Sequence, residues 1–143
     1  MNAEIDMSGR IEESTKPTIL ALSNKIKLSI KISSRYKQTL FNKTKRIYPQ
    51  LSYTLIRVYM FSSFVNELII ASKLEINSVI FIDTEYSGYE AIIKDRINGH
   101  LQKHHIPPDF YSIRFKQVGK NSPAHHLAIG VLRKDIKPTI FHK

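Results

Sequence analysis

The chain has 143 residues and a formal net charge of +10, with 42% apolar and 24% charged residues, which predicts one folded domain over residues 1–143. It has no cysteine, which excludes disulfides and thiolate metal sites. We see no apolar run near the roughly 18–20 residues of a membrane span and no signal peptide, so we expect a cytoplasmic protein that does not enter membranes.

The N-terminal part of the chain predicts three strands. Residues 3–7 are partly apolar and end at the turn signal Ser8-Gly9. After a polar loop, residues 17–22 are apolar, and residues 25–33 alternate between apolar and polar side chains, which is the period of a half-buried strand. Because only a short polar turn separates the last two segments, we expect a hairpin, and with residues 3–7 an antiparallel meander.

The middle of the chain predicts a long helix and a buried strand. Residues 35–49 are basic and lightly aromatic, and they fit either a short helix or a loop. Residues 51–74 are the longest apolar-rich segment and have helical spacing. Residues 78–82 are an almost continuous apolar run, as expected for a central strand that is buried on both faces.

The C-terminal part predicts two helices around a strand. Ser87 and Glu90 have the spacing of a capping box, which would open a helix that continues to about residue 103. Residues 111–118 predict a strand. An N-cap serine and a proline at positions 122–123 open a last helix to roughly residue 134. Strands separated by helices can join a sheet in parallel, so the fold class is α/β.

The basic residues are unevenly distributed. No acidic residue occurs between Glu13 and Glu67. The same stretch carries ten basic residues: Lys16, Lys25, Lys27, Lys31, Arg35, Lys37, Lys43, Lys45, Arg46 and Arg57. A surface of one sign attracts a polyanion, so we expect nucleic acid as the partner. A solvated basic face and an anionic membrane surface are the alternatives.

Two aspartates stand at the ends of predicted strands. Asp6 ends the first strand and Asp83 ends the fourth, and each follows an isoleucine. If these strands are parallel neighbours, the two carboxylates meet, which is unfavourable by itself but suits Mg²⁺ or Mn²⁺. The alternatives are a turn residue for Asp6 and a helix cap or an ion pair with lysine for Asp83.

The order of the elements resembles the RNase H-like superfamily over nearly the whole chain. That family places an Asp on the first strand, a Glu on the first helix, an Asp ending the fourth strand and an acid on the last helix. Asp6 in IDMSG, Glu67 in FVNEL and Asp83 in FIDTEY look like the first three. AHHLA (124–128) is similar to the family's A-D-x-L-A pattern, with His125 in place of the acid.

The resemblance implies a mixed five-stranded sheet of order 3-2-1-4-5 with helices on both faces. It also implies a metal-dependent nuclease that hydrolyses phosphodiester bonds, with Asp6, Asp83 and Glu67 holding Mg²⁺ or Mn²⁺ beside His125. Glu85, two residues past Asp83, is the reserve candidate for a ligand. Histidine is a legitimate ligand or base, and some resolvase-like members have it at this position. Equally, the change fits an altered or lost activity.

Several basic residues are candidates for gripping the nucleic acid backbone: Lys37, Lys43, Lys45 and Arg46. Lys120, just before the last helix, is a candidate because the amides of a helix N-terminus also attract anions, with an ordinary loop as the alternative. The chain lacks the P-loop pattern, so we do not expect hydrolysis of nucleoside triphosphates. His100 and His104 are four apart on one helix, and surface histidines explain them better than a metal site.

Three alternative functions stay open. A junction-resolving nuclease on the same fold would use similar ligands and would need a homodimer. A non-catalytic nucleic-acid-binding module would bind without cleavage that depends on Mg²⁺. A scaffold protein would use the basic surface to meet an acidic protein.

Overall fold

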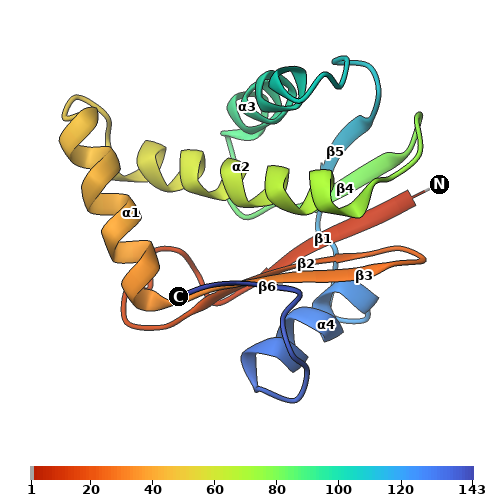
Figure 1. The fold of residues 1–143 in the computed structure, drawn as a ribbon, viewed down its shortest axis with the longest axis horizontal. Helices are drawn as coiled ribbons and strands as arrows, with labels where there is room; N and C mark the ends of the chain where they lie inside the picture. The colour runs from red at the N-terminus through yellow and green to blue at the C-terminus, as the bar shows by residue number, and fades with distance from the viewer. Residues whose placement is uncertain (1) are drawn as a thin grey trace.

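The computed structural model describes residues 2–143, which form six strands in one mixed sheet and four helices (Figure 1). In chain order the elements are β1 (Asn2–Ser8), β2 (Thr18–Ser23), β3 (Lys27–Ile32), α1 (Ser34–Ile47), α2 (Tyr53–Ser72), β4 (Val79–Asp83), α3 (Glu90–Lys103), β5 (Ser112–Lys116), α4 (Pro123–Leu132) and β6 (Ile140–His142). The α/β class is therefore confirmed.

The sheet has the order β5-β4-β1-β2-β3-β6. Its first five strands in the chain stand in the predicted order. The prediction of five strands in total is wrong, because β6 adds a sixth, parallel to β3 with Ile30 opposite Ile140. A strand of three residues is too short to show a period of two, so the sequence pattern did not reveal it.

The strand directions follow from the connections. Short loops join β1, β2 and β3, which pair antiparallel, and Asp6 lies opposite Ala21. Helices precede β4 and β5, which join in parallel, with Ile5 opposite Ile82 and Ile82 opposite Phe115. The carboxyl ends of β1 and β4 therefore lie side by side.

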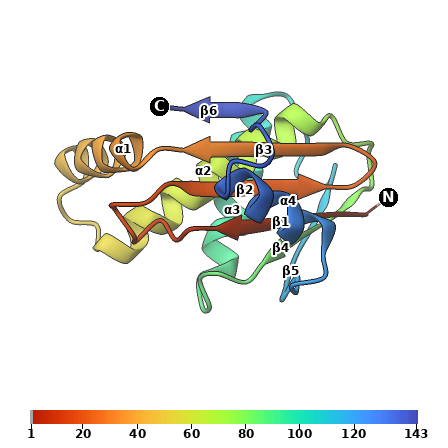
Figure 2. The ribbon, with the colours of Figure 1, turned by 90° about the horizontal axis from the view of Figure 1, so that it is seen from below.

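Helices cover both faces of the sheet, as predicted. Helices α2 and α3 lie over one face and α4 lies over the other, while α1 stands beyond one end of the strands (Figures 1 and 2). The larger core lies between α2, α3 and the sheet. The smaller core lies beneath α4 and comprises Ile19, Ala21, Leu127, Ala128 and Val131. Because β2 contributes to both cores, all six of its residues are buried.

Helix α2 is the central helix of the larger core. By length and composition alone this helix of 20 residues could cross a bilayer, which corrects the expectation that no segment approaches that size. In the folded chain, 56% of its most apolar window is buried within the protein. Apolar residues all round a helix are expected where it is buried in a core as well as in a membrane.

The starts of α1 and α4 are set by serine caps. Residues 35–49, which fit a helix or a loop, form a helix whose first turn is capped when Ser33 Oγ accepts from the Tyr36 N–H at 3.0 Å. The predicted start of α4 is confirmed, because Ser122 Oγ accepts from the Ala124 N–H at 3.1 Å and Pro123 occupies the first helical position. Both caps satisfy amides that a helix leaves without a partner.

The start of α3 differs from the prediction. The helix begins at Glu90, and Tyr89 precedes it without a side-chain cap. The predicted capping box is wrong, because the Glu90 carboxylate accepts from the Gly88 N–H at 2.9 Å instead of from Ser87. Gly88 has φ +90°, a conformation that a non-glycine residue rarely adopts, so the chain turns here before the helix can start.

Candidate metal centre

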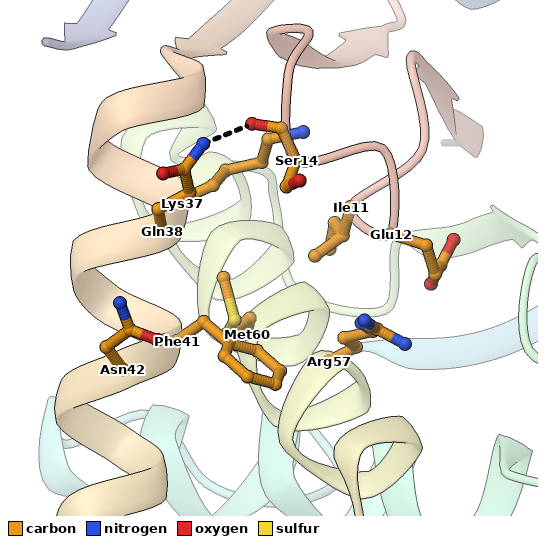
Figure 3. Close-up of a pocket in the computed structure, with 9 residues that line it drawn as sticks. All are labelled: Ile11, Glu12, Ser14, Lys37, Gln38, Phe41, Asn42, Arg57 and Met60. Atoms are coloured by element: carbon orange, nitrogen blue, oxygen red, sulfur yellow. Dashed lines mark hydrogen bonds between the residues drawn. The ribbon is translucent and has the colours of Figure 1, made fainter.

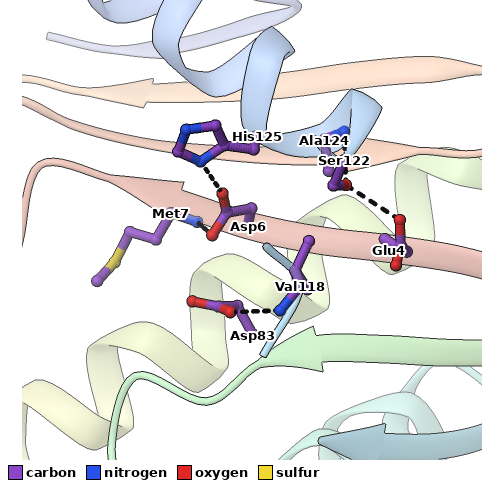
Figure 4. A network of polar contacts seen from close by, with 8 residues as sticks. All are labelled: Glu4, Asp6, Met7, Asp83, Val118, Ser122, Ala124 and His125. Atoms are coloured by element: carbon purple, nitrogen blue, oxygen red, sulfur yellow. Dashed lines mark hydrogen bonds and ion pairs between the residues drawn. The ribbon is translucent and has the colours of Figure 1, made fainter. Parts of the chain in front are cut away.

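Asp6 and Asp83 meet at the carboxyl ends of β1 and β4. The parallel register that sets Ile5 opposite Ile82 brings the next residue of each strand to the same edge, on the face that α4 covers (Figure 4). The side chain of Glu85 joins them from the segment after β4. One oxygen from each of the three carboxylates lies within 4.8 Å of the others. The predicted juxtaposition of the two aspartates is therefore present.

Burial raises the pKa values of two members of this group, Asp6 and Glu85. Asp6 is only 6% exposed, and burial raises its pKa, while the hydrogen bond from His125 opposes the rise. Glu85 is affected more, because burial, a hydrogen bond to Asp83 and the charges of Asp83 and Asp6 raise its pKa to about 8, while Arg10 acts in the opposite direction. Like charges at this separation repel, and a divalent cation among them would relieve that repulsion.

His125 approaches the group from the first turn of α4. Its Nδ1 lies 2.8 Å from Asp6 Oδ2, and its side chain is 25% exposed (Figure 4). The other oxygen of Asp6 accepts from the Met7 N–H at 2.9 Å. His125 therefore orients the Asp6 carboxylate and contacts solvent at the same time, so it can hold or move a proton at the edge of the group.

A second contact fixes α4 against β1. Ser122 Oγ donates to Glu4 Oε1 at 3.0 Å (Figure 4). Glu4 also pairs with Lys116 on β5 at 2.8 Å. Since side chains alternate along a strand, Glu4 and Asp6 lie on the same face of β1. The start of α4 is thus held at two places two residues apart on β1, which determines where His125 lies.

Asp83 also has a structural partner. Its Oδ1 accepts from the Val118 N–H at 2.8 Å, which connects the loop after β5 to the end of β4 (Figure 4). This bond leaves the second oxygen of Asp83 for the carboxylate group. The loop it fixes leads to Lys120, which is exposed just before α4.

Glu67 lies outside this group. It is on α2, across the sheet from α4, and both of its oxygens lie 2.9 Å from Nε2 of His142 on β6. The prediction of Glu67 as a ligand is corrected by this position: the carboxylate joins the C-terminal strand to the long helix. Among residues 2–143, the third carboxylate near Asp6 and Asp83 is Glu85, which was the reserve candidate.

The predicted phosphate contacts fall into two classes. Lys43, Arg46 and Lys120 are exposed. Lys37 is only 2% exposed, and its Nζ donates to the backbone oxygens of Arg10 and Glu13 and to Thr18 Oγ1. This corrects the prediction for Lys37, because an ammonium used inside the protein cannot contact a phosphate. If residues 35–49 had been assigned as a helix, the helical period would have placed Lys37 on the inner face of α1.

Lys45 is partly engaged as well. Its Nζ donates to the backbone oxygens of Pro49 and Leu51 at 3.0 and 2.7 Å and lies 5.1 Å from the centre of the Tyr53 ring. A cation at the C-terminal end of a helix is also favoured by the helix dipole. Lys45 therefore stabilises the turn between α1 and α2, and of the four phosphate contacts predicted in this segment Lys43 and Arg46 are the exposed ones.

No model of a known protein family matches the chain, and no curated protein matches its sequence.

Proposed function

We propose that the protein is a metal-dependent nuclease of RNase H-like fold that hydrolyses phosphodiester bonds in nucleic acid. The observation that supports this most directly is the group of Asp6, Asp83 and Glu85, brought together from two strands and a following segment. Oxygen ligands from carboxylates are those that Mg²⁺ and Mn²⁺ prefer, so the donor set fits such an ion. When bound, such an ion would activate water and neutralise charge on the phosphate.

The chain's own residues have distinct tasks in this proposal. Asp6 and Asp83 hold the ion, with Glu85 as a third ligand once it has lost its proton. His125 holds Asp6 in position and can accept or donate a proton at its solvent-facing side. The exposed cations Lys43, Arg46 and Lys120 would bind phosphates, which contributes affinity but little sequence selectivity.

A junction-resolving nuclease is the second candidate. The observation in its favour is that His125, which stands where most of the family has an acid, touches Asp6 directly. Some resolvase-like members of the superfamily have a histidine at the corresponding position. We propose nucleic acid as the partner in both cases, and a homodimer for the second.

The test is a cleavage assay on end-labelled single strands, duplex DNA, an RNA–DNA hybrid and a four-way junction. We expect cleavage with Mg²⁺ or Mn²⁺ and none with a chelator. Asp83→Asn keeps an oxygen for the Val118 N–H while it removes the charge, so it should fold and bind yet cleave more than about a hundredfold slower. Asp95→Asn, at an exposed position on α3, is the matched control.

The outcomes separate the candidates. Preference for the junction, together with a dimer in gel filtration, would favour the resolving nuclease. Binding without cleavage that depends on the metal would show a non-catalytic binding module and would refute the proposed activity.

A further inference from the structure

A cavity of about 320 Å³ lies between α1, α2 and the loop that connects β1 to β2 (Figure 3). Pockets for small organic groups start at about this size, near 300 Å³. None of the carboxylates of the metal centre lines the cavity. It is therefore a separate feature of the molecule.

Two side chains of α1 hold the wall of this cavity in place. The Lys37 ammonium donates to two backbone oxygens of the loop, at Arg10 and Glu13. One residue further along the helix, Gln38 Nε2 donates to Ser14 O at 2.7 Å (Figure 3). The loop is thus fastened to the helix at three backbone oxygens, so the cavity exists before any ligand arrives. A preformed site avoids the entropy cost of ordering a loop on binding.

The lining combines an apolar wall with polar groups. Ile11, Phe41 and Met60 provide the apolar and aromatic surface. Glu12, Asn42 and Arg57 provide acceptors and donors of hydrogen bonds (Figure 3). The guanidinium of Arg57 lies 5.4 Å from the centre of the Phe41 ring, so a planar cation and an aromatic ring border the same space.

These features fit a planar aromatic group with polar edges. The Glu12 carboxylate would repel a phosphate, but it can accept from an N–H of a heterocycle. Phe41 and Arg57 offer faces on which a ring can stack. A purely apolar ligand would cover the Asn42 amide, the Arg57 guanidinium and the second oxygen of Glu12 without offering them hydrogen bonds, which costs free energy.

The lining of the cavity is linked to the metal centre through one hydrogen bond and through the chain. Tyr86 donates its O–H to Glu12 Oε1 at 2.7 Å, and Tyr86 directly follows Glu85, a member of the carboxylate group. The loop that forms the cavity wall starts after β1, the strand that carries Asp6. A nucleotide strand with one phosphate at the carboxylates could therefore place a neighbouring base in the cavity.

We propose that this cavity binds one unpaired nucleobase of the nucleic acid that the metal centre cleaves. The inference rests on the proposed function, and it adds that the substrate has an extruded or single-stranded nucleotide close to the cleaved bond. Extruding a base costs little where the nucleic acid is already unpaired, so the cavity would select single strands, flaps or branch points over continuous duplex.

The experiment measures binding to the full-length Asp83→Asn variant, so that cleavage does not interfere. Single-stranded oligonucleotides carry one abasic position, moved along the strand one nucleotide at a time. Stacking of one base is worth enough to change affinity by about tenfold or more. We expect the affinity to fall by this factor when the abasic site is at one particular position. The fluorescent base 2-aminopurine at that position should change its fluorescence on binding.

Two variants connect the effect to the cavity. Asn42→Trp places a ring at the exposed rim of the cavity and should remove the sensitivity to the abasic position. Thr39→Ala, exposed on the same helix and outside the lining, is the matched control and should keep it. A free nucleoside monophosphate is the competing probe, which should bind far more weakly than the oligonucleotide.

The result that would overturn the inference is equal affinity, within about twofold, for all abasic strands while binding of the intact strand persists. Tight binding of the free nucleotide with no abasic effect would overturn it too, since the cavity would then serve a small molecule. If one abasic position lowers the affinity but the wild-type protein does not cleave with Mg²⁺ or Mn²⁺, the nucleobase site is supported and the nuclease activity is refuted.

Discussion

Replacing Glu85 by glutamine should remove most of the pH dependence of stability in the metal-free protein. The surroundings of Glu85 raise its pKa from the ordinary value of 4.5 to about 8. A folded-state pKa above the unfolded one means that the folded protein binds the proton more tightly. The associated stability is fully present below pH 4.5 and is lost as the pH rises through about 8. The raised pKa of Asp6 acts in the same direction.

The magnitude follows from the size of that rise. Each pKa unit corresponds to about 1.4 kcal/mol, so Glu85 would lower the free energy of unfolding by up to roughly 5 kcal/mol between acid and alkaline pH. This is an upper limit, because the side chain is partly exposed and water screens the charges. In the Glu85→Gln variant the amide stays neutral at every pH. It can still donate to Asp83, as the protonated carboxyl does.

The assay is urea unfolding with a chelator at pH 5, 7 and 9. We expect the wild type to lose stability over this range and Glu85→Gln to lose much less, so that the variant is the more stable protein at pH 9. Glu75→Gln, at an exposed turn, should follow the wild type. In a parallel series without chelator, added Mn²⁺ should stabilise the wild type increasingly with pH, because metal and proton compete for the same carboxylates. Equal pH profiles for wild type and Glu85→Gln would refute the reasoning.

Three further predictions concern the buried lysine, the exposed cations and the histidine of the metal centre. Lys37→Met should lower the free energy of unfolding by about 3 kcal/mol in urea titrations, since three oxygens lose a charged donor, and a loss below about 1 kcal/mol would contradict the buried role. Lys43→Ala and Arg46→Ala should each reduce the salt dependence of nucleic acid binding by about one unit of slope, with unchanged slopes as the contrary result. His125→Ala should weaken Mn²⁺ binding about 10- to 100-fold in calorimetry, because Asp6 loses the side chain that orients it, whereas unchanged affinity would exclude that role.

Much of the sheet could be predicted because its strands have clear periodic patterns. The alternation in residues 25–33 predicted β3, and the apolar run of residues 78–82 predicted β4. The helix between β3 and β4 made a parallel β1–β4 pair possible, and that pair brings Asp6 and Asp83 together. The central part of the candidate site therefore follows from patterns that are visible in the sequence.

Features that depend on tertiary contacts could not be predicted. Glu67 was predicted from a resemblance alone, but packing sets the direction of a side chain on α2. Here the partner of Glu67 is His142, on a strand too short to detect. Lys37 counted as a surface cation because residues 35–49 fitted either a helix or a loop, so no face of this segment could be assigned as the inner one. Composition describes the charge of a segment but not which of its cations are buried.

The position of Glu85 among the ligands could not be predicted for a similar reason. It follows β4 by two residues, in a segment without regular structure, so no periodicity fixes the direction of its side chain. The closeness of Glu85 to Asp83 along the chain was the available signal. The cavity beside α1 had none, because it is formed by segments that are far apart in sequence.

The central claim is that Asp6, Asp83 and Glu85 form the binding site of a catalytic divalent ion. Its most direct test is a crystal structure of the wild-type protein grown with Mn²⁺ at pH 8, in which anomalous scattering locates the ion. We expect a peak at about 2.1 Å from carboxylate oxygens of Asp6 and Asp83. Well-ordered crystals with these carboxylates free of Mn²⁺, or with the ion held by other residues, would contradict it.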